Sequence, residues 1–313
     1  MLSTEHILGV EEFAQMLGIS VEQLSPAVQN LITSKDLRYQ KLSAPELEEN
    51  LLNILKKLDN NQFSQVGQQR QNIWESAWSE YLQSFSQQEF DLDALIPRFI
   101  SANPIVRLRQ EYVRACSTNF ELSFFKALRL YLFQTYLADV DNVYEFGCGS
   151  GYNLIDLAHL YPQKKIYGLD WSKSAVEIAT LLGENKKLLV KSYPFDFFEP
   201  DYSLEIPPSS AVLTMCALEQ IGARHEEVIQ FILQKSPQIC LNMEPIFELY
   251  DQNNLVDYMA VKYHNLRGYL SGYLSRLQEL EQQGKLEILH TQKVCFGSLY
   301  HEGYSFVVWR PIA

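Results

Sequence analysis

The residues best suited to do chemistry are three alternating glycines followed by an acid. Segment 143–151 is an apolar run that ends in Gly147, Gly149 and Gly151. This order predicts a buried strand, a tight turn and a helix, because glycine accepts positive φ and lets a ligand approach the bare backbone. Asp170 ends the next apolar run, where its carboxylate could accept hydrogen bonds from ribose hydroxyls. We therefore expect a nucleotide-like ligand at this turn.

The glycine spacing argues against phosphates in the turn. The order is G-x-G-x-G, with Tyr152 next, whereas a dinucleotide pyrophosphate is held by G-x-G-x-x-G. The Gly-Lys-Ser or Gly-Lys-Thr of a phosphate-binding loop is also absent from the sequence. An NAD-dependent enzyme is therefore disfavoured.

Alternating strands and helices must position this turn. Such alternation predicts a mostly parallel sheet with helices on both faces. The last two strands have only the loop 297–303 between them and should form an antiparallel pair at one edge. Strands are expected at 143–146, 165–170, 188–190, 211–216, 238–243, 287–295 and 304–309, and helices near 123–133, 152–160, 174–182, 224–234 and 255–282.

The N-terminal part has a different pattern. Its first 95 or so residues are predicted to be helical, without the alternation of a strand. Trp74 and Trp78 are one helical turn apart, which favours a core stripe, and lining a substrate pocket is the alternative. We expect a helical domain at residues 1–120, acting as a cap, a substrate domain or a homodimer contact, and a second domain at 121–313.

Composition limits the partners and the compartment. The formal net charge of −12 opposes binding to nucleic acid or to an anionic membrane surface. A hydrophobic content of 47% with 20% charged residues is typical of a globular protein, without an apolar run long enough to span a membrane. The five scattered cysteines are expected to be reduced, in a cytoplasmic protein, and the six histidines lack metal-ligand spacing.

Glu145 with the glycine turn and Asp170 resembles the first two motifs of the class I S-adenosylmethionine-dependent methyltransferases. The resemblance implies an α/β fold with a seven-stranded doubly wound sheet whose last two strands are antiparallel. It covers roughly residues 139–311. Through segments 74–78 and 302–305, the whole chain also resembles a bacterial group of such proteins whose substrate is unassigned.

The resemblance implies S-adenosylmethionine as the cofactor and gives each matching position a role. The glycine turn and the acid before it would face the amino-acid part of the cofactor, and Asp170 would bind the ribose. Trp171 would pack on the adenine, and the segment after the third strand would meet the adenine amine. The residues assigned in this way are Glu145, Gly147, Cys148, Gly149, Gly151, Asp170, Trp171, Asp196, Phe197 and Ala217.

The methyl acceptor must lie elsewhere, and we expect a small molecule methylated on nitrogen or oxygen. Methyl transfer needs alignment, exclusion of water and, for some acceptors, a base. Ligands enter an open α/β sheet at the carboxyl ends of its strands. The candidate pocket residues there and on the following helix are Glu219, Glu244, His264, Arg267 and Tyr269. Acidic side chains would suit a cationic amine, whereas Arg107, Arg109 and Arg267 would suit a carboxylate, and the sequence does not choose.

Two other functions fit the same motifs. The chain could methylate a protein or peptide that its N-terminal part recruits. It could also be a regulatory protein that binds the cofactor without catalysis.

Overall fold

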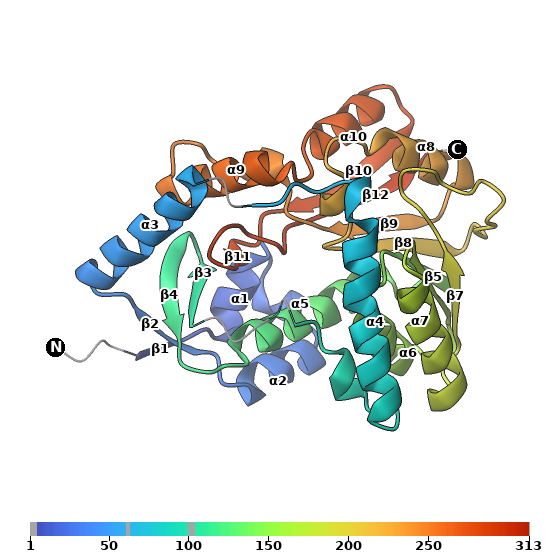
Figure 1. Ribbon diagram of the computed structural model, residues 1–313, viewed down its shortest axis with the longest axis horizontal. Helices are drawn as coiled ribbons and strands as arrows, with labels where there is room; N and C mark the ends of the chain where they lie inside the picture. The colour runs from blue at the N-terminus through green and yellow to red at the C-terminus, as the bar shows by residue number, and fades with distance from the viewer. Residues whose placement is uncertain (1–4, 61–62, 99, 101–103, 313) are drawn as a thin grey trace.

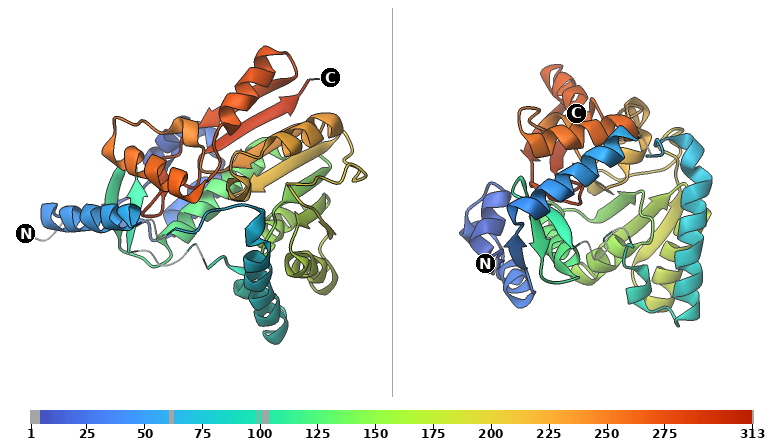
Figure 2. Two further views of the ribbon diagram at one scale, coloured as in Figure 1. Left: turned by 45° about the horizontal axis from the view of Figure 1, so that its top comes forward. Right: turned by 60° about the vertical axis from the view of Figure 1, so that its left-hand side comes forward.

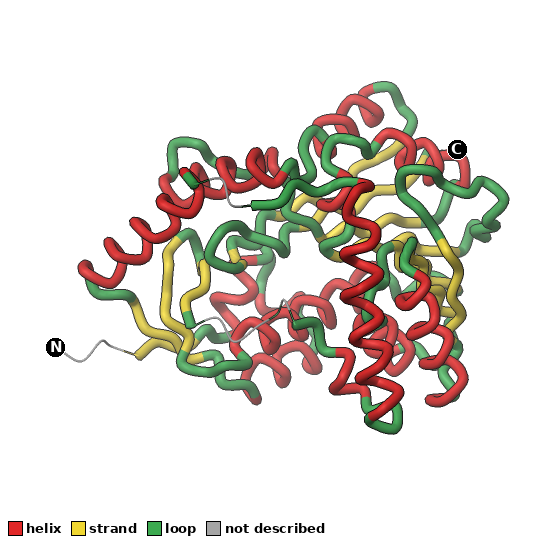
Figure 3. The backbone as a smooth tube through the Cα atoms, viewed as in Figure 1, coloured by secondary structure: helices red, strands yellow, loops and turns green. Residues whose placement is uncertain are grey.

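The computed structural model describes residues 5–60, 63–98, 100 and 104–312. Its strands form two sheets that lie apart from each other (Figures 1 and 3). The larger is a seven-stranded sheet in the order β10-β12-β9-β8-β5-β6-β7. Its strands are β5 (Asn142–Phe146), β6 (Lys165–Asp170), β7 (Val190–Pro194), β8 (Ser210–Met215), β9 (Ile239–Met243), β10 (Leu286–Gln292) and β12 (Phe306–Pro311).

The direction of the strands agrees with the sequence prediction. Strands β5 to β9 pair in parallel, and β12 is antiparallel to both of its neighbours, β9 and β10. The expected antiparallel pair is therefore confirmed, with the last strand of the chain inserted between β9 and the edge strand β10. Because the connections between parallel strands cross the faces of the sheet, the strands meet with their carboxyl ends at one edge.

Both faces of the central sheet are buried. Along β5, Val143 belongs to one hydrophobic cluster, while Tyr144 and Phe146 belong to another on the opposite face. The first cluster includes residues of α5 (Phe120–Tyr136), α6 (Tyr152–Leu160) and α7 (Lys173–Lys186), and the second includes residues of α8 (Glu226–Lys235) and α10 (Tyr273–Gln282). Burial on both faces explains why these strands read as continuous apolar runs.

The N-terminal part is mostly helical, but it is not free of strands, so that part of the sequence prediction is wrong. A five-stranded antiparallel sheet has the order β1-β2-β4-β3-β11. Four of its strands precede α5, whereas β11 comes from the loop between the last two strands of the central sheet. The strands are β1 (Glu5–Ile7), β2 (Arg38–Lys41), β3 (Ile105–Leu108), β4 (Glu111–Ala115) and β11 (Phe296–Gly297).

The N-terminal helices pack against helices that come later in the chain. Helix α4 lies along α7, and α3 lies beside α9, in the views of Figures 1 and 2. Helices α1 and α2 contact each other, and α2 also packs on α5. The bounds are α1 (Val10–Met16), α2 (Pro26–Ser34), α3 (Ala44–Asp59), α4 (Gln71–Gln87) and α9 (Leu255–Arg267).

The long helix expected at 255–282 is two helices, α9 and α10. Helix α9 ends at Arg267, just before Gly268, and α10 begins after Gly272; both glycines have positive φ (63° and 77°). Positive φ cannot continue a right-handed helix, so the chain turns at these two residues. In the described part of the chain, none of the helices has the length and apolar character needed to cross a bilayer.

Candidate functional site

The glycine turn lies at the carboxyl end of β5, as expected. Gly147, Gly149 and Gly151 all have positive φ, and α6 begins directly after them. A Cβ on Gly147 would lie 2.4 Å from the Cβ of Ala217, in the turn after the neighbouring strand β8. Only glycine fits so close an approach, which brings the two turns together at one edge of the sheet.

Asp170, the last residue of β6, connects the glycine turn to the start of α7. Its Oδ2 accepts a hydrogen bond from Gly149 N (3.0 Å), and its Oδ1 accepts one from Ser172 N (2.9 Å). Burial raises the pKa of this carboxyl to about 6, although the backbone donors oppose the shift. Asp170 therefore fixes the glycine turn and the start of α7. It also lines a cavity.

Glu145 is fully buried on β5 and lines neither cavity described below, and one of its carboxylate oxygens is satisfied. Its Oε1 accepts a hydrogen bond from Asn153 Nδ2 (2.6 Å). Nothing among the described residues donates to Oε2, which is also buried. Burial raises the pKa of Glu145 to about 8. Because an unsatisfied buried carboxylate oxygen is costly, this atom points to a missing donor, such as an ammonium group.

Two adjoining cavities open over these residues. The first, of about 520 Å³, is lined by Asp170, Trp171, Phe197, Ala217 and Gln220, among others. The second, of about 550 Å³, is lined by Cys148, Gly149, Asn153, Phe125 and Tyr304, among others. Trp74, Trp78, Gly147 and Cys216 line both cavities. The two are thus halves of one elongated site.

The tryptophan pair of α4 forms a wall of this site. The rings of Trp74 and Trp78 are stacked, with centroids 5.6 Å apart. Trp78 is buried in the main core, in line with the favoured interpretation, and both rings also line the cavities. Between them on the helix, Glu75 accepts hydrogen bonds from Ser172 Oγ and Ser174 Oγ (both 2.7 Å) at the start of α7. This contact fixes the helix over the glycine turn.

The remaining positions assigned to the cofactor differ in their placement. Trp171 and Phe197 line the first cavity. Asp196 lines neither cavity, and its Oδ1 accepts a hydrogen bond from Phe198 N (2.8 Å). Gly151 also lies outside both cavities and precedes the first residue of α6.

Glu244 and Glu219 meet at the turn after β8, but in different ways. Both oxygens of Glu244 accept backbone hydrogen bonds, from Ala217 and Leu218 (3.1 Å each) and from Glu219 (3.2 Å). Glu244 therefore shapes the turn instead of facing a ligand. Glu219 accepts a hydrogen bond from Gln220 Nε2 (2.8 Å), and burial together with the charge of Glu244 raises its pKa to about 8.

The other three acceptor candidates come together at the end of α9. His264 is surrounded by aromatic rings, and burial holds its pKa well below the usual range. Neither ring nitrogen has a hydrogen-bond partner within the part of the chain that the structure describes. Arg267 donates to the carbonyl and hydroxyl of Ser64 and to the hydroxyl of Tyr269 (3.3 Å to the last). None of the three lines the two cavities directly.

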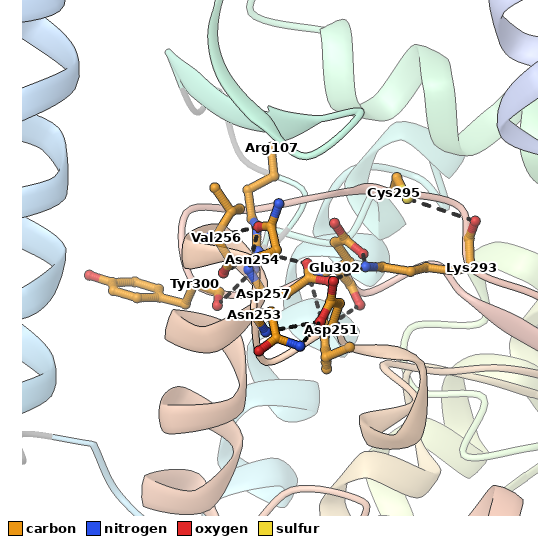
Figure 4. Close-up of polar contacts among 11 residues, drawn as sticks. Arg107, Asp251, Asn253, Asn254, Val256, Asp257, Lys293, Cys295, Tyr300 and Glu302 are labelled. Carbon is orange, nitrogen blue, oxygen red and sulfur yellow. Dashed lines mark hydrogen bonds and ion pairs between the residues drawn. The ribbon is translucent and has the colours of Figure 1, made fainter.

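Arg107, one of the three arginines considered for a carboxylate, is engaged elsewhere. Figure 4 shows it beside Asp257, with Lys293 and Glu302 close by. Arg107 and Asp257 are fully buried, with Nη2 and Oδ1 3.6 Å apart, and Lys293 contacts both Asp257 and Glu302. Two cations and two carboxylates thus balance in the interior. Arg109, by contrast, is exposed on the turn between β3 and β4.

Sequence reasoning missed Arg70 and Cys216. Arg70 precedes Trp74 and Trp78 by one and two helical turns, so an i, i+4, i+8 spacing could have shown it. Cys216 has a positive φ of 54°, uncommon for a residue with a side chain, and nothing in the sequence predicts it. No group of three or more potential metal ligands is found within residues 5–60, 63–98, 100 and 104–312.

Comparison with known proteins supports the fold. No family model and no curated protein sequence matches the chain. Among solved structures, the [4+2]-cyclase SpnF is 15% identical and superposes with a TM-score of 0.52 over 80% of this chain and 98% of its own. Human N-acetylserotonin methyltransferase in complex with S-adenosylmethionine (15% identical, TM-score 0.40) is matched over 60% of this chain and 55% of its own. The chain therefore spans about half the length of that human enzyme.

The O-methyltransferase NcsB1 of neocarzinostatin biosynthesis, crystallised with S-adenosylmethionine, is 17% identical, with a TM-score of 0.39 over 62% of this chain and 58% of its own. Identities this low speak to the fold alone. The strand order, the antiparallel β12 and the likeness to SpnF together confirm the class I methyltransferase fold that the resemblance implied. A shared fold does not establish a shared reaction.

Proposed function

We propose that the protein binds S-adenosylmethionine in the two joined cavities and transfers its methyl group to the nitrogen or oxygen of a small molecule. The observation that carries this proposal is the pair of acids beside the glycine turn, Glu145 on β5 before it and Asp170 at the end of the neighbouring strand β6. Asp170 lines the first cavity, and Glu145 lies beside the second with an unpartnered oxygen. A ribose and an ammonium group are the complements of these two acids.

The residues present fit the cofactor. Asp170 would accept hydrogen bonds from the ribose hydroxyls, and the aromatic rings of Trp171 and Phe197 would hold the adenine. The free oxygen of Glu145 would accept a hydrogen bond from the ammonium group, which would also favour the ionised carboxylate. When bound, the cofactor supplies an electrophilic methyl carbon attached to a sulfonium sulfur.

The chain's own contribution would be alignment and exclusion of water. Trp74 and Trp78 cover the glycine turn from α4, and Glu75 holds that helix against α7. Glu244 fixes the turn after β8, and this turn carries Ala217 and Gln220 to the cavity wall. Positioning of this kind can supply most of the acceleration of an in-line displacement.

Glu219 is the group best suited to take a proton from the acceptor. Its pKa of about 8 makes it a stronger base than an ordinary carboxylate once it is ionised. It is hydrogen-bonded to Gln220, which lines the first cavity. Glu244 acts as a positioning residue, because its two oxygens already accept three backbone hydrogen bonds.

Isothermal titration calorimetry with S-adenosylhomocysteine tests the cofactor assignment. Asp170→Ala should lose about 10- to 100-fold in affinity, the effect of removing a charge-assisted hydrogen bond. Asp201→Ala, at an exposed acid farther along the chain, should bind like the wild type. No heat of binding for either S-adenosylmethionine or S-adenosylhomocysteine with the wild-type protein would overturn the proposal.

A labelled-methyl assay separates this function from its alternatives. The label should enter the metabolite fraction of a cell extract. Label that enters only proteins would favour the peptide methyltransferase, and tight cofactor binding without any transfer would favour a regulatory protein. SpnF shares this fold and is described as a [4+2]-cyclase, so a result without methyl transfer is one of the outcomes considered.

A further inference from the structure

We propose that the methyl acceptor carries an anionic group, a carboxylate or a phosphate, that binds between Arg70 and Arg267 at the rim of the first cavity. This inference rests on the proposed function, since it names the chemical class of the acceptor for the same site. The sequence left a cationic amine and an anion as alternatives, and this inference selects the anion.

Arg70 and Arg267 come close together without a carboxylate partner. Both guanidinium groups donate to the same atom, Ser64 Oγ, at 3.4 Å from Arg70 Nη1 and 2.9 Å from Arg267 Nη1. In the described part of the chain, no carboxylate oxygen lies within 4 Å of either guanidinium. Arg267 is only 9% exposed, so bulk solvent does not offset its charge.

The balanced network around Arg107 shows how this fold pairs cations that are as deeply buried as Arg267, whereas Arg70 is half-buried. Arg107 and Lys293 are matched by Asp257 and Glu302. The pair at Ser64 has no such match. Because buried charges are normally paired, the missing counter-charge is expected to come from a ligand.

The arginine pair lies where an acceptor would enter. The guanidinium of Arg70 stacks on the ring of Trp74, 5.4 Å from its centroid, and Trp74 lines both cavities. On the other side, Arg267 donates to the hydroxyl of Tyr269. Arg70 and Arg267 both interact electrostatically with Glu219. Glu219 is hydrogen-bonded to Gln220, which lines the first cavity.

The unsatisfied atoms at this rim are mainly donors. Arg70 Nε, Arg267 Nε and Trp74 Nε1 are buried, and no acceptor is found for them among the described residues. Anionic oxygens accept several hydrogen bonds at once, and guanidinium groups match carboxylate and phosphate geometry. Glu219 does not pair with either arginine, because in the described part of the chain its carboxylate oxygens lie more than 4 Å from both guanidinium groups.

The two guanidinium groups also repel each other. Burial and the charge of Arg267 together lower the pKa of Arg70. An anion bound to both guanidinium groups would relieve this repulsion. An acceptor with a cationic group at the same place would instead add a third positive charge, so the arrangement disfavours a cationic amine here.

Calorimetry with small anions tests the inference on the full-length protein, both alone and saturated with S-adenosylhomocysteine. The probes are benzoate, inorganic phosphate and the uncharged benzamide. Benzoate or phosphate should bind at least about tenfold more tightly than benzamide, and comparison of the two anions tells which group the site prefers. Equal binding of benzoate, phosphate and benzamide would overturn the inference.

Substitution of the two arginines tests where the anion binds. Arg70→Gln and Arg267→Gln should each weaken binding of the preferred anion by about tenfold or more, whereas Arg109→Gln, at the exposed turn, should not. Since Arg267 also holds Ser64, Arg70→Gln keeps the test valid if the other variant does not fold. Wild-type affinity in Arg70→Gln would reject the site. Binding of S-adenosylhomocysteine without any anion effect would reject this inference alone, whereas anion binding without S-adenosylhomocysteine binding would reject the proposed function alone.

Discussion

Gly149 lies directly against the indole of Trp78, so that a Cβ on the glycine would be 2.7 Å from Cζ2 of the ring. The turn at the end of β5 and the helix from the N-terminal part therefore share a surface that has no room for one more carbon atom. The φ of Gly149 is also positive, at 52°. Two separate constraints thus act on this one residue.

Gly149→Ala should lower both the stability of the protein and its affinity for S-adenosylhomocysteine. The positive φ alone costs about 1–2 kcal/mol for a residue with a Cβ, and the overlap with Trp78 adds to it. Gly284→Ala is the matched control, because Gly284 has a φ of 69° and nothing within 4 Å of its Cβ position. Chemical denaturation should give a larger loss for Gly149→Ala than for Gly284→Ala. Equal losses would mean that the ring moves aside freely.

Glu75→Gln should loosen α4 from the start of α7. Glu75 accepts hydrogen bonds from two serine hydroxyls, and loss of the charge should destabilise the protein by about 1–3 kcal/mol. Glu80→Gln, on the same helix, removes only an exposed ion pair with Arg98 and should cost less than about 1 kcal/mol. Hydrogen exchange of α4 amides should rise in the first variant only. Unchanged exchange in Glu75→Gln would contradict this role.

Arg107→Ala should be severely destabilising, by about 3–5 kcal/mol, because it leaves Asp257 as an uncompensated buried charge. Arg109→Ala, two residues along the chain and exposed, should change the free energy of unfolding by no more than about 0.5 kcal/mol. Urea denaturation of the two variants measures the difference. Similar stabilities would show that Lys293 alone can balance the network.

The protein without ligand should lose stability as the pH rises from about 7 to about 8. Burial raises the pKa values of Glu145 and Glu219 to about 8, so the folded state keeps protons that the unfolded state has already lost. When the folded state binds more protons, stability falls with pH, by up to about 1.4 kcal/mol per pH unit for each proton. Thermal unfolding at several pH values should show this slope, and Glu145→Gln should reduce it. A rise in stability over this range would contradict the assignment.

Below about pH 6.5 the buried histidines oppose the effect of the buried carboxyls on stability. Burial lowers the pKa of His264 well below its ordinary value and that of His301 to about 3. Here the unfolded state binds the extra protons, so the histidine contribution to stability falls as the pH is lowered through the ordinary range of histidine. The same unfolding series should therefore have a shallower slope below about pH 6.5 than between about pH 7 and 8, because the histidine protons offset the carboxyl protons there. His264→Phe should steepen the slope on the acidic side, and an unchanged slope there would show that His264 takes up its proton in the folded state.

The central sheet could be predicted from sequence because its signal is local. Long apolar runs, the glycine turn and the acid at the end of β6 each depend on neighbouring residues. The small sheet gave no such signal. The exposed and partly buried positions of β2 do not alternate, and β11 is only two residues long, so both strands are defined by distant partners.

The site residues divide in the same way. Positions near the glycine turn follow from its motif, whereas the direction of a long side chain does not. Glu244 was placed in the acceptor pocket because it follows a strand, but three backbone N–H groups from the neighbouring turn take up its oxygens. Arg267 donates a hydrogen bond to Ser64, about two hundred residues earlier in the chain. No pattern in the sequence predicts this partner. Charge alone could not show which arginine lacks a counter-ion.

The pairing of β11 with β3 has a consequence for the order in which the molecule is made. Phe296 and Gly297 leave the ribosome long after Arg107 and Leu108, the residues that they pair with. The sheet begun by the first part of the chain therefore stays incomplete during most of translation. During that time the edge of β3 is unpaired and can form hydrogen bonds with strands of other chains. The edge becomes protected only when the segment that forms β11 has been synthesised.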